Sequence, residues 1–180
     1  MLLAWDRRSS ADSRAALGFY LFKLALGKDS SAVDPPDTLT DDAVREALSR
    51  AEQRRDAEFG QDAMFGTVFR VGRRGGARTW PVSGGTLSEA GMATPRGIDF
   101  AKIGKEMVGY TGQSSTQIVI LTKPPQSYMV IPLGESDHPE SNHWDDQAEK
   151  LFSKSQAKPT YFANRKELEK HVTRREELAF

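Results

Sequence analysis

Hydrophobic residues recur at helical spacing in the first third of the chain. A helix is predicted from about Asp12 to Leu26, with Gly27 after it as a C-terminal stop. Because apolar residues fall on more than one of its faces, we expect this helix to be buried nearly all round. The apolar residues concerned are Leu17, Phe19, Tyr20, Leu21, Phe22, Leu24 and Leu26.

A second helix is predicted after the polar loop of residues 29–39. Thr40 is a good N-cap, and Asp41 and Asp42 would lie in the first turn, where the helix dipole favours negative charge. Its apolar stripe consists of Val44, Ala47, Leu48 and Ala51. The remaining positions are mostly charged, so the pattern indicates a surface helix with one solvated face.

After the helices the pattern changes to short extended runs. Strands are predicted over residues 68–71, 117–122 and 127–132. The last two are joined by residues 123–126 alone, and so short a connection favours an antiparallel hairpin. Both of these strands are apolar at consecutive positions, which is typical of strands covered on both faces. Residues 91–104 show no clear period and are predicted to form an irregular connection.

A turn rich in arginine and glycine is predicted from Arg73 to Arg78. Three arginines around two glycines could hold a phosphate, but no strand-to-helix phosphate loop surrounds them, and a solvated hairpin tip is favoured. The glycines at Gly84–Gly85 and Gly104 are likewise predicted to be turn residues.

The stretch from Gly134 to Phe152, GESDHPESNHWDDQAEKLF, combines turn-forming residues with a histidine and tryptophan pair. Pro139 prevents a helix from starting before it, so we expect a loop followed by a helix that is capped by Ser141 or Asn142. Trp144 falls on the same helical face as Ala148 and Leu151, and is predicted to be a core anchor rather than a substrate platform.

The same stretch contains atoms that could coordinate a metal. The candidate ligands are Asp137, His138, His143, Asp145 and Asp146. The two histidines do not have the spacing of a helical metal site, and a structural His143 that bonds the backbone of its loop is the favoured alternative. A nucleophilic triad of Ser141, His143 and Asp146 is disfavoured, because residues so close in sequence rarely converge on one point.

The C-terminal region shows a short extended segment over residues 158–162. Asn164 can cap a last helix, predicted from Arg165 to Val172. The charged end from Thr173 to Phe180 is expected to fray.

Composition adds mainly exclusions. The chain has 180 residues, 25 basic and 25 acidic, for a net charge of +0, which gives no electrostatic reason to expect nucleic acid or an anionic membrane as partner. No apolar run reaches the roughly 18 to 20 residues that span a bilayer, so no membrane insertion is expected, and MLLAWDRRSS does not read as an export signal. With no Cys, the chain contains no disulfide or thiol chemistry.

The loop stretch resembles a segment of the penicillin amidase family, the penicillin and acyl-homoserine-lactone acylases among the N-terminal-nucleophile hydrolases. Its pattern, G-x-S-x-x-P-x-S-x-H-[YW]-x-D-Q, is matched in order by Gly134, Ser136, Pro139, Ser141, His143, Trp144, Asp146 and Gln147. Three further stretches are similar to segments of the family and follow in the family's order: residues 2–17, 65–70 and 80–85. A further stretch, residues 110–117, departs from the family, because it lacks the Arg of the family's G-x-S-x-R pattern.

The resemblance implies an α+β fold, namely the C-terminal portion of the αββα sandwich in the family's β-chain. Residues 1–60 would be mainly helical, 61–134 strands and loops, and 135–180 the loop with C-terminal helices. It also implies a hydrolase of linear amide bonds that acts through an acyl-enzyme. The family's nucleophile is the first residue of the mature β-chain, usually Ser, and its calcium site also lies outside the matching region, so no catalytic, cofactor-binding or metal residue is assigned here.

We therefore expect this chain to be structural and inactive alone, with the remainder of the acylase as its partner. Members of the family are typically periplasmic or secreted. The alternatives are a non-catalytic module that completes another chain and, less favoured, a metal-dependent hydrolase that uses its own histidines. Without its partner the chain is expected to be aggregation-prone or loosely packed.

Overall fold

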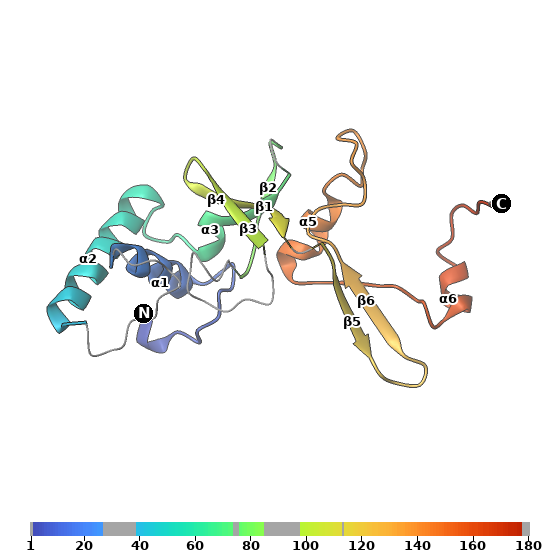
Figure 1. Cartoon of the computed structure of the whole chain (residues 1–180), viewed down its shortest axis with the longest axis horizontal. Coiled ribbons are helices and arrows are strands. Elements are labelled where there is room, and N and C mark those ends of the chain that lie inside the picture. The colour runs from blue at the N-terminus through green and yellow to red at the C-terminus, as the bar shows by residue number, and fades with distance from the viewer. Residues whose placement is uncertain (1, 27–38, 74–75, 85–97, 113, 178–180) are drawn as a thin grey trace.

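The structure is a computed structural model that describes residues 2–26, 39–73, 76–84, 98–112 and 114–177. It shows an elongated molecule in which helices and a four-stranded sheet form one end, while a hairpin and a C-terminal arm extend from the other (Figure 1). Helices and strands are mixed, so the predicted α+β class is confirmed. Several predicted positions lie outside the described residues: Gly27, most of the loop 29–39, Gly85 and residues 91–97.

The N-terminal end is helical. A 3-10 turn, η1 (Leu2–Ala4), precedes α1 (Arg14–Ala25), α2 (Asp41–Glu58) and the single turn α3 (Phe65–Val68). Two caps define the starts of the longer helices. The Ser13 side chain accepts a hydrogen bond from the backbone N–H of Ala16, and Thr40 accepts one from Ala43, as predicted for Thr40.

Helix α1 begins two residues later than predicted and is less enclosed than predicted. Leu17, Tyr20 and Leu21 are buried, but Leu24 is exposed. Helix α2 buries Ala47 and Ala51 against its neighbours and exposes its charged face, as predicted.

Two sheets follow. The first has the order β2-β1-β4-β3, where β1 is Phe69–Gly72, β2 Thr79–Pro81, β3 Ile98–Ile103 and β4 Glu106–Gly112. Its β1–β4 pair is parallel and its other pairs are antiparallel, so this sheet is mixed. The second has the order β5-β6-β7, all antiparallel, where β5 is Thr116–Ile120, β6 Gln126–Val130 and β7 Lys158–Pro159.

Strand β3 overturns the prediction of an irregular connection for the described residues 98–103, and β4 was not predicted. Two glycines in β4, Gly109 and Gly112, weaken its strand signal, and its pairing with β3 and with the distant β1 determines its conformation. Gly104, with φ 61°, forms the turn between β3 and β4, as predicted for a turn glycine. Val68 belongs to α3 rather than to the strand that follows it.

The core lies between α1, α3 and the first sheet. Phe69 is its centre: its ring stacks on Phe65 at 4.1 Å between centroids and meets Tyr20 and Phe100 edge-on at 4.8 and 5.1 Å. Phe152, in the 3-10 turn η3 (Phe152–Lys154), is also buried in this cluster. The loop region is therefore anchored to the N-terminal body.

The β5–β6 hairpin is confirmed, but the prediction that both faces of these strands are covered is wrong for β5. Ile118, Val119 and Ile120 are 44 to 51% exposed, and Leu121 after them is 90% exposed. In Figure 1 the hairpin projects away from the body. Among the described residues, no helix is long and apolar enough to cross a membrane.

The C-terminal helices are shorter than predicted. Helix α5 (Asp146–Lys150) begins after Asp145, four or three residues beyond the predicted caps Ser141 and Asn142. Helix α6 (Arg165–Glu169) has the predicted cap, because the Asn164 side chain accepts from the N–H of Glu167. It ends three residues before the predicted end.

Candidate functional site

The loop of residues 134–145 is closed by hydrogen bonds between its two ends. The N–H of Ser136 donates to the carbonyl of His143 at 3.1 Å, and the N–H of Trp144 donates to the carbonyl of Ser141 at 3.1 Å. The hydroxyls of Ser136 and Ser141 accept from the backbone N–H groups two residues later, at His138 and His143. These local serine turns explain why the chain does not enter a helix at Ser141.

Gly134 lies where the two ends of the loop approach each other. A Cβ atom there would lie 2.1 Å from the carbonyl oxygen of His143 and 2.7 Å from the carbonyl carbon of Trp144. Both are backbone atoms, which cannot rotate away. Closure of the loop therefore requires glycine at this position.

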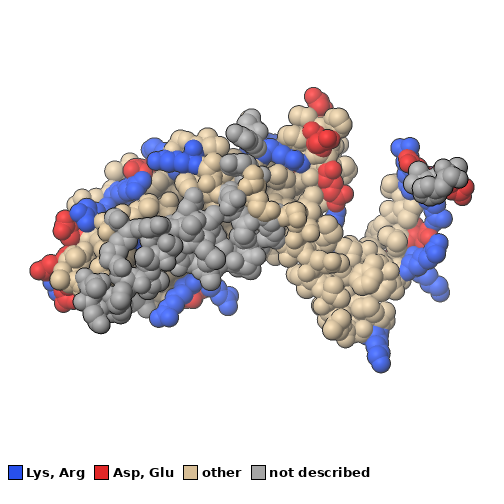
Figure 2. Space-filling model, in the orientation of Figure 1, with Lys and Arg blue, Asp and Glu red and all other residues tan. Residues whose placement is uncertain are grey.

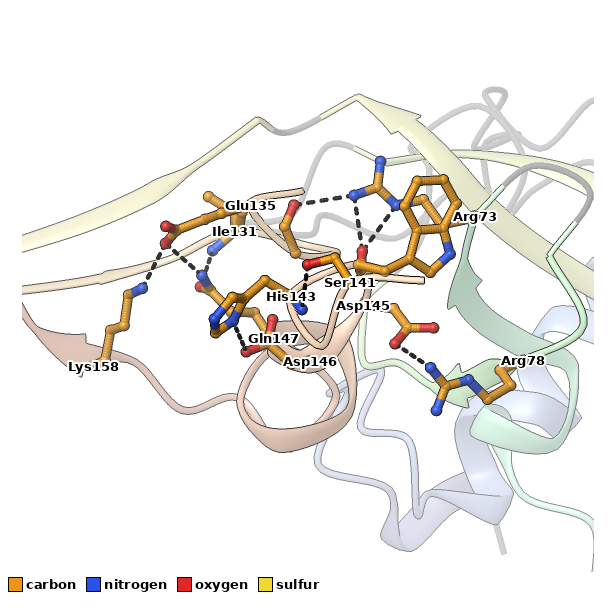
Figure 3. Close-up of polar contacts among 12 residues, drawn as sticks. Arg73, Arg78, Ile131, Glu135, Ser141, His143, Asp145, Asp146, Gln147 and Lys158 are labelled. Atoms are coloured by element: carbon orange, nitrogen blue, oxygen red, sulfur yellow. Dashed lines mark hydrogen bonds and ion pairs between the residues drawn. The ribbon is translucent and has the colours of Figure 1, made fainter. Parts of the chain in front are cut away.

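Arg73, at the end of β1, fastens the loop to the first sheet (Figure 3). Its Nη2 donates to the carbonyls of Gly134, Ser136 and Trp144 at 3.1, 2.7 and 2.9 Å, and its Nε also donates to Trp144 at 3.1 Å. The guanidinium lies 4.2 Å from the ring centroid of the same tryptophan. The prediction of a solvated hairpin tip is therefore wrong for Arg73.

Arg78, at the other end of the same turn, pairs with Asp145. Its Nη2 lies 2.5 Å from the Asp145 carboxylate, whose side chain is almost completely buried. Arg73 and Arg78 thus both hold the loop. Neither contact was predicted, although the basic turn and the acidic stretch Asp145–Asp146 are complementary in charge, which is the signal that could have indicated them.

Gln147 connects the loop to the second sheet. Its side-chain oxygen accepts from the N–H of Ile131 at 3.1 Å, and its nitrogen donates to Glu135 at 2.8 Å. Glu135 also accepts from Lys158, whose Nζ lies 2.6 Å away. The hydrogen bond from Lys158 lowers the pKa of the Glu135 carboxyl below its usual value; the charge of Lys158 and the bond from Gln147 act in the same direction, and partial burial and the nearby Asp146 oppose them.

The five candidate metal ligands do not come together. His143 Nδ1 lies 3.1 Å from Asp146 Oδ2, His138 pairs with Asp137 at 3.5 Å, and Asp145 is held by Arg78. In the part of the chain that the structure describes, no group of three or more potential ligands could hold a metal ion. The other carboxylate oxygen of Asp146 is buried, and no partner for it is found among the described residues.

The disfavoured triad of Ser141, His143 and Asp146 is not formed as a hydrogen-bonded series of side chains. His143 and Asp146 interact through their side chains, but the Ser141 hydroxyl accepts from the backbone N–H of His143. The favoured prediction was a structural His143 that bonds the backbone of its loop. In the structure the ring of His143 instead bonds the Asp146 side chain. Trp144 packs under Arg73 at the loop rather than on a face of α5.

The other three stretches of family-like sequence meet in the body of the molecule. The N–H of Gly66 donates to the carbonyl of Ala11 at 2.7 Å, and the N–H of Ala11 donates to the Ser83 hydroxyl at 3.0 Å. The N–H of Gly84 donates to the carbonyl of Ser9 at 2.8 Å. Segments that are far apart in the sequence are thus joined by two backbone–backbone hydrogen bonds and by one to the Ser83 side chain.

Three of the four stretches are joined in the body of the molecule, and the fourth forms the loop that Arg73 binds. Comparison with protein families then gives the class of this protein. The penicillin amidase family matches residues 1–168. The match covers most of the chain, so this protein belongs to the penicillin amidase family, whose members are amidohydrolases of the acylase type. The resemblance predicted from the sequence is confirmed at that level. A search of curated proteins found no match.

Proposed function

We propose that this chain is the structural C-terminal part of a penicillin-amidase-type acylase that hydrolyses linear amide bonds. The observation that carries the proposal is the family match over residues 1–168. In the complete enzyme a hydroxyl nucleophile would attack the amide carbonyl, the amine would leave, and water would hydrolyse the acyl-enzyme. The substrates would be penicillins or acyl-homoserine lactones, giving a role in antibiotic metabolism or in quorum quenching.

The contacts of the motif residues support a structural role for this part. Gly134 allows the two ends of the loop to approach each other, and Ser136 and Ser141 make turns. Gln147 links the loop to Ile131, the residue after β6. The backbone carbonyls of Gly134, Ser136 and Trp144 accept hydrogen bonds from Arg73. The polar groups of these motif residues are engaged in hydrogen bonds within the chain. We therefore propose that the nucleophile comes from a part of the acylase outside this chain.

A second candidate, a non-catalytic module that completes another chain, is favoured by a groove between η1, α1 and α2. The groove has a volume of about 1040 Å³. Its lining includes the apolar side chains of Leu2, Trp5, Phe19, Phe22, Val44 and Leu48. An apolar groove of this size is a suitable surface for side chains of another polypeptide.

Amidase activity tests both candidates. The purified chain is incubated with a chromogenic phenylacetyl amide and with a long-chain acyl-homoserine lactone, with and without calcium or zinc. It is then co-expressed with the catalytic part of a family acylase from which the corresponding C-terminal region has been removed. We expect no turnover from the chain alone and turnover from the combination.

The controls separate the possible outcomes. Arg73→Met, which releases the loop, should reduce turnover of the combination, whereas the exposed substitution Arg165→Ala should not. Binding without turnover would favour the non-catalytic module. Turnover by the chain alone that is lost in His143→Ala would contradict the structural role and restore the histidine-based hydrolase.

A further inference from the structure

We draw no further inference here: the strongest candidate, the exposed apolar edge of β5 in the hairpin that projects from the body (Figure 2), carries none because nothing in the structure shows what covers it.

Discussion

Arg73 is the residue on which the loop depends most, because one guanidinium accounts for the hydrogen bonds of three loop carbonyls. Arg73→Met keeps an apolar stem over Trp144 but removes every donor, and we expect it to lower the free energy of unfolding by about 2–3 kcal/mol. Lysine should restore only part of this loss, since an ammonium cannot reproduce the planar fork. Urea unfolding at one fixed protein concentration measures both variants.

The control for Arg73 is Arg45→Ala, which removes exposed helical ion pairs with Asp41 and Asp42. It should cost about 0.5 kcal/mol or less. An Arg73→Met variant no less stable than this control would show that solvent replaces the guanidinium at the loop carbonyls.

Glu135 makes a pH-dependent contribution because the hydrogen bond from Lys158 lowers its folded pKa. A depressed pKa stabilises the protein fully above the usual value of 4.5, and this stabilisation is lost as the pH falls through the folded pKa. Because both side chains are more than one third exposed, the pair is worth only about 0.2–1 kcal/mol. We expect Glu135→Gln to be less stable than wild type by this amount at neutral pH and equal to it in acid.

Denaturant unfolding at several pH values measures this difference. Glu140→Gln, at an exposed position in the same loop, serves as control. A stability gap between Glu135→Gln and wild type that stays constant from neutral pH to strong acid would refute the linkage.

At the scale of elements, the sequence predicted best where one local signal decides the structure. Thr40 and Asn164 cap their helices as predicted, and the predicted hairpin is formed, with residues 121–125 as its connection. The start of α5 was predicted wrongly because Ser141 forms a turn with His143 instead of a cap. Strand β4 was missed because its glycines weaken the local strand signal, while its pairing with β3 and with the distant β1 determines its conformation.

In the site too, local features were predictable from the sequence and long-range contacts were not. Its motif residues could be identified from their order along the chain, but their roles depend on groups from other elements. Arg73 comes from the end of β1 and Lys158 from β7, and no spacing within the loop indicates either. Charge complementarity alone pointed towards the contact between Arg78 and Asp145.

The close approach at Gly134 is a property of the loop as an element. Gly134→Ala places a Cβ against two backbone groups, so we expect a loss of roughly 3 kcal/mol or displacement of the loop. Gly60→Ala provides the comparison, because it meets no atom within 4 Å but has φ 95°. It should lose only about 1–2 kcal/mol from backbone strain. Similar losses for both variants, measured by urea unfolding, would show that the loop moves apart at little cost.

For the whole molecule, stability is expected to fall from the N-terminal body towards the C-terminal arm. The body contains the Phe69 cluster, whereas the β5–β6 hairpin projects with its outer strand exposed and α6 buries no residue. Amide hydrogen exchange should therefore be slowest in α1, β1 and β4 and fastest in α6.

The amides of β1 serve as the internal reference for this order, because β1 pairs on both sides within the first sheet. Exchange of the β1 amides as fast as that of the α6 amides would contradict the expected order of stability.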